Sequence, residues 1–184
     1  MASEAAQGEI KHALRFTISS SSIRNAYVWP ARHLTTNGAM TSSLPPMGQL
    51  FRIKASYAIP SSYGTQSKAI LQALKTYGMY IADGGSNMYI QGDPSADWQD
   101  STFSPVQSVG SSAFEAVDLS PLMGRAGFDP DSAAVPPPFP FPSGQRLICQ
   151  PHRTASCAAS LYPANSLVVA DGVQIDLVNP HVGR

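Results

Sequence analysis

The stretch GEIKHALRFTI, residues 8–18, decides the fold class because its apolar side chains recur at every second position. A period of two is typical of a β-strand with one buried face, so the sequence predicts a strand over residues 9–18. The predicted apolar face consists of Ile10, His12, Leu14, Phe16 and Ile18. The other face carries Glu9, Lys11, Ala13, Arg15 and Thr17. Glu9 and Arg15 would lie about 20 Å apart on such a strand, so each needs partners from neighbouring strands.

Four further segments have the composition of strands. A second strand is predicted at residues 27–29 and ends at Pro30, because proline cannot donate to a strand ladder. Residues 49–59 alternate as cleanly as the first strand. Residues 79–90 predict two short strands around a glycine-rich turn, and residues 113–117 predict a short closing strand.

One segment has the period of a helix. Apolar residues in the segment 66–77 follow helical spacing, and Gly78 stands where a glycine favours the end of a helix. Pro94 could open a second, short helix with Asp93 as its N-cap. The sequence therefore predicts a β-rich fold, a mainly antiparallel sheet or sandwich, with one packed α-helix at about 66–77.

The chain changes character near residue 120. Residues 8–120 are periodic and predict a β-rich domain, either complete or half of a larger domain. Residues 121–184 predict an irregular tail, because the run PPPFPFP at 136–142 cannot pair inside a sheet. Only residues 166–178 in this tail have a strand-like pattern, which would suit a late hairpin around Asp171-Gly172.

Composition excludes several classes of function. The net charge is zero with 13% charged residues, so the chain has no basic surface for a nucleic acid. No apolar run approaches the roughly 20 residues of a membrane span, and residues 1–10 lack the features of a signal peptide. Neither a metal site nor a cofactor motif is expected, since Cys149, His152 and Cys157 are too few for a structural metal. Cys149 and Cys157 fit a small disulfide loop and two free thiols equally well.

Five consecutive segments resemble a known group of proteins. They are GEIKHALRFT, AYVWPARH, PPMGQLFRIKASY, AILQALKTYGMYIADGGSNMYIQG and DPSADWQD. In this order they resemble the C-terminal half of a family of secreted bacterial proteins that are mostly uncharacterised. The resemblance implies an exported, β-rich domain that binds or acts on glycans outside the cell. The resemblance implies no particular active-site residues, and it does not extend over residues 121–184.

Four residues are candidates for catalysis. His33 follows the second predicted strand, at a loop where functional residues concentrate. His12 could serve as acid or base near neutral pH, although a histidine on an apolar face is more often a core residue. Glu9 and Asp83 could supply the carboxylate that sugar cleavage requires, although each also fits a structural role at a solvated sheet face or in a turn.

A second group of residues is a candidate for sugar binding. Tyr27 and Trp29 are two positions apart and would form an aromatic platform on one strand face, unless they belong to the core. Trp98 lies among acidic residues that follow the predicted sheet. The cationic candidates, which would suit an acidic sugar or another carboxylate, are Arg15, Arg32 and Lys54.

The sequence thus favours a domain that binds or acts on polysaccharide and leaves its activity open. A glycoside hydrolase or lyase is one form of this hypothesis. A non-catalytic glycan-binding or wall-associated module is the alternative, and a truncated, inactive relative is another. The enzyme form of the hypothesis requires a carboxylate within about 10 Å of a histidine or of a second carboxylate, whereas the binding form does not.

Overall fold

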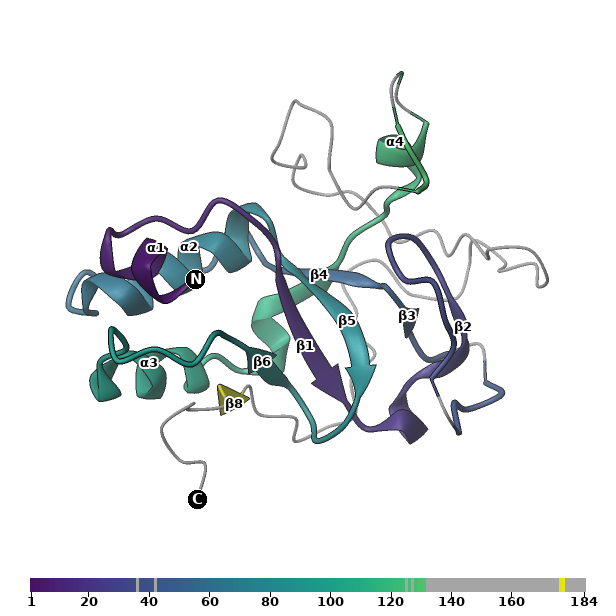
Figure 1. Cartoon of the computed structure of the whole chain (residues 1–184), viewed down its shortest axis with the longest axis horizontal. Helices are drawn as coiled ribbons and strands as arrows, with labels where there is room; N and C mark the ends of the chain where they lie inside the picture. Colours follow the sequence, from purple (N-terminus) through teal and green to yellow (C-terminus); the bar gives the residue numbers. More distant parts are fainter. Residues whose placement is uncertain (36, 42, 125, 127, 132–175, 178–184) are drawn as a thin grey trace.

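The computed structural model describes residues 1–35, 37–41, 43–124, 126, 128–131 and 176–177. Five strands from residues 14–116 and a two-residue strand near the C-terminus form one sheet in the order β7-β4-β5-β1-β6-β8 (Figure 1). The strands of this sheet are β1 (Leu14–Ile18), β4 (Leu50–Ile53), β5 (Met79–Gly84), β6 (Tyr89–Gln91), β7 (Phe114–Ala116) and β8 (Asp176–Leu177). A separate pair consists of β2 (Arg24–Tyr27) and β3 (Pro46–Met47).

Three of the described α-helices gather on one side of this sheet. Figure 1 shows α1, α2 and α3 beside the sheet, opposite the end that carries β2 and β3. The α-helices are α1 (Ala2–Ala6), α2 (Thr65–Thr76), α3 (Phe103–Gln107) and α4 (Ser120–Met123). Short 3-10 turns are η1 (Ser20–Ser22), η2 (Asp100–Thr102) and η3 (Ser111–Ala113). None of the helices in the described part of the chain has the length and apolar character needed to cross a bilayer.

The predicted helix is confirmed almost to the residue. Helix α2 spans Thr65–Thr76 and buries Ile70, Leu71 and Leu74 on the side that faces the sheet. It ends as expected, because Gly78 has a positive φ of 76° and its backbone N–H bonds back to the Ala73 carbonyl. A side chain at this position would meet the Phe51 carbonyl oxygen at 2.3 Å, so glycine also permits close packing against β4.

The first strand is shorter than the alternation predicts. β1 begins only at Leu14, because the preceding segment packs against α1, a helix that the sequence did not predict. The Glu9 backbone N–H bonds to the Glu4 carbonyl, and the His12 ring bonds to the Glu4 carboxylate. The expected placement of His12 on the apolar face is therefore wrong, since the segment that carries it leaves the strand conformation.

The order of the central strands also differs from the expectation. β5 and β6 do not pair with each other as a hairpin, because β1 lies between them. β1 pairs with β5 in parallel and with β6 antiparallel, so the sheet is mixed. The turn that joins β5 to β6 crosses the end of β1, where the Thr17 hydroxyl bonds to the Ser86 carbonyl and the Ser19 N–H bonds to the Asn87 side chain.

Other predictions have mixed outcomes. The strand expected at 49–59 is the shorter β4, and the one at 113–117 is confirmed as β7. The strand expected at 27–29 is β2, which ends at Tyr27, two residues before the cis peptide bond between Trp29 and Pro30. Residues 94–99 form no helix, because the Asp93 carboxylate bonds to the Ala2 N–H instead of capping one. The tail beyond residue 131, with the predicted hairpin and both cysteines, lies outside the described residues except for β8.

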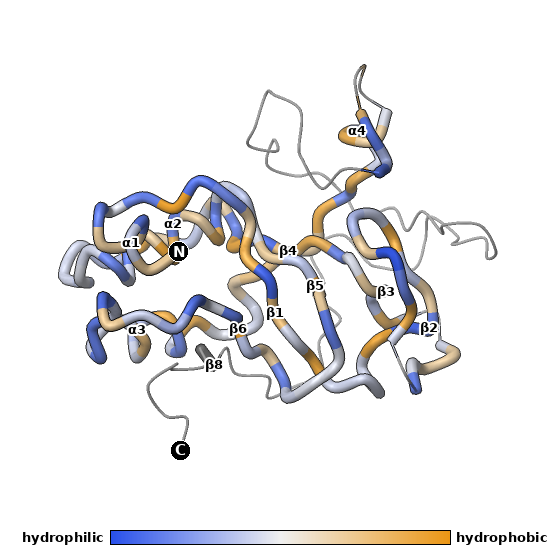
Figure 2. Tube along the Cα trace, in the orientation of Figure 1, coloured by the Kyte–Doolittle hydropathy of each residue, from blue (hydrophilic) through white to orange (hydrophobic). Residues whose placement is uncertain are grey.

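The sheet has one face that forms the main core. Every second residue of the strands is buried against α1, α2 and α3 on this face, which we call the helix-covered face. Phe16 of β1 and Phe51 of β4 meet there edge to face with ring centroids 5.9 Å apart. Along the tube in Figure 2, apolar and polar segments alternate through β1 and β5, as expected for strands with two unlike faces. The other set of residues points away from the helices, and we call their side the opposite face.

Candidate functional site

The opposite face divides into a covered end and an open part. At the covered end, Trp29, Leu50 and the segment Val117–Leu122 form a second, smaller apolar cluster, and Tyr80 of β5 packs against it. The open part lies beside it over β1 and β6 and consists of Arg15, Tyr89 and Gln91, which we call the open strip. Because these residues follow a single strand pair, their spacing is fixed by the rigid centre of the sheet.

Register places the open strip directly beside Tyr80. Arg15 lies opposite Tyr80 on one side and opposite Gln91 on the other. Tyr89 lies opposite Thr17, two positions along β1, so its ring is a diagonal neighbour of Arg15 at about 7–8 Å between Cα atoms. Arg15 and Gln91 are exposed, and Tyr89 is half-buried.

The Arg15 side chain is exposed on the central strand of the sheet. No described residue forms an ion pair or a hydrogen bond with its side chain. The other arginine on this face behaves differently, because Arg52 is 5% exposed and its Nε donates to the Glu115 carboxylate at 2.6 Å. Arg52 and Glu115 are opposite each other on β4 and β7, so this ion pair connects the two strands on a buried part of the opposite face.

The aromatic platform expected at Tyr27 and Trp29 does not form on one exposed face. Trp29 is only 6% exposed and lies beyond the end of β2, where its ring contacts Tyr80 edge to face at 6.3 Å between centroids. Tyr27 is half-buried and packs against the main core. Trp98 is also 6% exposed, its ring packs against Phe103 at 5.7 Å, and its indole N–H donates to the Asp93 carbonyl. Both tryptophans are therefore buried residues in this conformation.

The cationic candidates are placed apart. Arg32 is exposed and its guanidinium bonds to the Asp131 carboxylate at 2.8 Å and to the Pro130 carbonyl at 2.6 Å. Lys54 lies at the end of β4 and its ammonium group donates to the Ser112 carbonyl at 2.7 Å. Of the cationic residues predicted for binding, only Arg15 lies on the open part of the opposite face.

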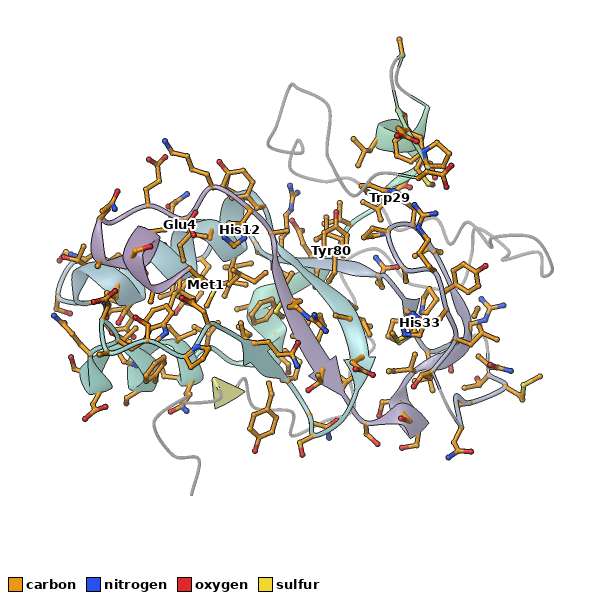
Figure 3. The ribbon with its side chains drawn as sticks, viewed as in Figure 1. Met1, Glu4, His12, Trp29, His33 and Tyr80 are labelled. Carbon is orange, nitrogen blue, oxygen red and sulfur yellow. The ribbon has the colours of Figure 1, made fainter. Side chains whose placement is uncertain are left out.

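The catalytic candidates fall into two separate regions (Figure 3). His12 is exposed near α1, whereas His33 lies on the side of the molecule that carries β2 and β3. Glu9 is exposed and forms an ion pair with Lys11 at 3.1 Å. Asp83 is exposed near the end of β5, where its carboxylate accepts a hydrogen bond from the Gly84 N–H. The structure thus does not combine these four residues in one site.

Around His12, the structure assembles a chain of ionisable groups. The His12 Nε2 lies 3.3 Å from the Glu4 carboxylate, and the same carboxylate binds the Met1 amino group at 3.1 Å. The Met1 amino group also lies 3.4 Å from Asp93. The hydrogen bond between the Glu4 carboxylate and the Met1 amino group is the main cause that lowers the pKa of Glu4. The amino group occupies the space between the two carboxylates, so this cluster holds α1 in place and resembles a structural anchor more than a catalytic pair.

Two residues after His33, at Thr35, the loop that follows β2 meets the 3-10 turn η1 and the end of β5. The Thr35 hydroxyl bonds to the Ser20 hydroxyl, and a side chain at Gly84 would meet both hydroxyl oxygens at less than 3 Å. Gly84 follows Asp83 directly, and Thr35 stands two positions after His33. The backbone segments that carry these two candidates are therefore neighbours at the carboxyl ends of the parallel strands β1 and β5.

Tyr80, Tyr89 and Gln91 are site residues that the sequence did not single out. Alternation in the segment 89–91 places Tyr89 and Gln91 on one face, but nothing in it shows that this face borders Arg15. That juxtaposition depends on β1 lying between β5 and β6, which is a long-range feature. The described residues contain no group of three histidine, cysteine or acidic side chains suited to a metal ion.

Comparison with known proteins adds no relative to this picture. Models of protein families, curated proteins and solved structures give no match to the chain. The similarity to secreted bacterial proteins and the glycan function that it implies therefore stay predictions.

Proposed function

We propose that this chain binds polysaccharide through the open strip of the sheet. The observation that carries the proposal is Arg15, an exposed guanidinium on the central strand without a partner among the described residues. A sheet surface with an arginine, a tyrosine and an amide side chain suits a sugar chain, which offers apolar ring faces and many hydroxyl groups. The guanidinium favours sugars with a carboxylate, which it can bind through two parallel hydrogen bonds.

We also propose that the chain acts outside the cell and that it binds polysaccharide without cleaving it. The low charge content and the segments similar to secreted bacterial proteins support that location. A sandwich in which a further sheet packs over the covered end of the opposite face and leaves the open strip exposed would also be compatible with the mixed sheet. Binding is favoured over cleavage because His12 and His33 lie in separate regions (Figure 3), and because the carboxylate beside His12, that of Glu4, also binds the Met1 amino group.

Equilibrium binding to polygalacturonate and to a neutral β-glucan tests this proposal. We expect tighter binding to polygalacturonate and a loss of about tenfold or more in affinity for Arg15→Gln, because a charge-assisted hydrogen bond contributes about 1.5–3 kcal/mol. Lys11→Gln is the matched control, since it removes the same charge from an exposed residue away from the strip. Equal affinities for both variants would overturn the proposal.

A hydrolase or lyase is a second candidate because the segments that carry His33 and Asp83 are neighbours near Gly84. His33 would act as the acid or base, and Asp83 would supply the carboxylate. Release of reducing ends or of unsaturated sugars from polygalacturonate measures this activity. It should disappear in His33→Asn and in Asp83→Asn, whereas His12→Asn, a change at a remote exposed histidine, should retain it. Equal loss in all three variants, or no activity in the unchanged chain, would contradict this candidate.

A further inference from the structure

Beside the open strip, an aromatic ring already occupies the surface of Trp29. The Phe128 ring meets the Trp29 ring at 5.2 Å between centroids and an interplanar angle of 71°. Phe128 and Tyr80 both pack at the margin of the small apolar cluster that contains Trp29. Trp29 is thus covered partly by a side chain that comes from the segment after α4, far from Trp29 in the sequence.

The attachment of Phe128 is weak compared with that of the rest of the cluster. Leu119 and Leu122 are buried, whereas Phe128 is only half-buried. The residues that follow are held by the ion pair between Arg32 and Asp131, whose side chains are 52% and 85% exposed. An exposed ion pair of this kind contributes little to stability. The Phe128 ring can therefore leave Trp29 at a smaller cost than α4 could.

The hydroxyl group of Tyr80 is unusual for its surroundings. Its oxygen is buried and has no hydrogen-bond partner in the part of the chain that the structure describes. Burial also raises the pKa of Tyr80, so the hydroxyl keeps its proton and remains a donor. A buried donor without a partner is unfavourable, and the rings of Trp29 and Phe128, with which Tyr80 shares the small apolar cluster, carry no oxygen that could accept from it.

We propose that Trp29 and Tyr80 form a covered subsite for a sugar ring, and that Phe128 occupies this subsite until the polysaccharide displaces it. The incoming ring would pack on Trp29 and offer a hydroxyl oxygen to Tyr80. Because Tyr80 is the direct cross-strand neighbour of Arg15, the subsite and the open strip form one continuous surface. The inference rests on the proposed function and names where the second sugar unit binds.

Binding of polygalacturonate to Phe128→Ala is the first test. Removing the competing ring should raise the affinity about fivefold, because the chain no longer spends part of its time in a conformation that excludes the sugar. Asp131→Asn should raise the affinity by a smaller factor. Met40→Ala is the control, because it truncates an exposed apolar side chain that is not part of this cluster.

Tyr80→Phe is the second test and separates a binding role from a structural one. The variant should unfold at the same or a higher temperature, since it removes a buried hydroxyl without a partner. Its affinity for polygalacturonate should nevertheless fall about fivefold or more in the Phe128→Ala background, because a hydrogen bond to the sugar is lost. A purely structural Tyr80 would leave this affinity unchanged.

The outcomes distinguish this inference from the proposal on which it rests. If Arg15→Gln weakens binding while Phe128→Ala binds no more tightly than the unchanged chain, the subsite is wrong and the open strip stands. If neither the unchanged chain nor Phe128→Ala binds any polysaccharide, both are wrong. Greater quenching of tryptophan fluorescence by acrylamide in Phe128→Ala would show that the ring covers Trp29, and unchanged quenching would contradict the cover.

Discussion

Arg15 and Phe16 are neighbours on β1, but they belong to opposite faces of the sheet. Phe16 is 1% exposed and packs against Phe51 and the helices, whereas Arg15 is exposed to solvent. The helix-covered face is apolar throughout, while the opposite face combines an apolar cluster, a buried ion pair and the open strip. The difference indicates that the helix-covered face belongs to the main core, whereas only part of the opposite face is buried.

The largest expected effect lies on the helix-covered face. Phe16→Ala should lower the free energy of unfolding by about 3–5 kcal/mol, because it leaves a cavity between β1, β4 and α2. Chemical denaturation measures this change. Thr17→Ala, a change at the next residue, should lower the free energy of unfolding much less. Similar losses of unfolding free energy for the two variants would contradict the assignment of the core face.

A smaller effect is expected from the ion pair at the covered end of the opposite face. Glu115→Ala should lower the free energy of unfolding by about 3 kcal/mol, because it leaves the buried Arg52 guanidinium without this carboxylate. The double variant Arg52→Met with Glu115→Leu should recover much of the loss, since apolar residues can replace a buried pair. Chemical denaturation of the unchanged chain, of Glu115→Ala and of the double variant measures these differences. If the double variant is as unstable as Glu115→Ala, the charged pair itself is required.

The smallest expected effect on stability concerns Glu4, whose carboxylate holds α1 in place. The folded chain lowers the pKa of Glu4, so the unfolded chain binds a proton at Glu4 at a higher pH than the folded chain. The stability from this group is therefore present above the unfolded pKa and is lost as the pH falls through the folded pKa. Thermal unfolding between neutral pH and pH about 3 should show a shallower loss for Glu4→Gln. Identical pH profiles would contradict a role for Glu4 in holding α1.

Local patterns in the sequence predicted the elements with strong periodicity. The helix at residues 66–77, the strand that contains Phe16 and the strand at residues 113–117 follow from spacing alone. The position of α1 could not be predicted, because five residues are too short for a helical period and the helix depends on contacts with residues 9–12. His12 was placed on the wrong side for the same reason.

The candidate site depended more strongly on long-range structure. Alternation correctly placed Arg15 away from the apolar face, but it could not show that Tyr80 and Gln91 are its neighbours. Those contacts arise because β1 lies between two strands that adjoin in the sequence. The sequence predicted that Trp29 and Trp98 bind sugar. Trp29 is instead covered partly by Phe128, which lies far away in the chain. Trp98 packs against Phe103 and bonds to the Asp93 carbonyl, contacts that alternation does not predict.

Mapping of backbone amide shifts by NMR during a titration with oligogalacturonate tests the central claim most directly. If the opposite face binds the sugar, the largest shifts should fall on Arg15, Tyr89 and Gln91 and extend to Tyr80. Residues of α2 on the helix-covered side, such as Gln72, should change little. Shifts centred on α1 and α2, or no shifts at saturating ligand, would contradict the division of the sheet into a core face and a binding face.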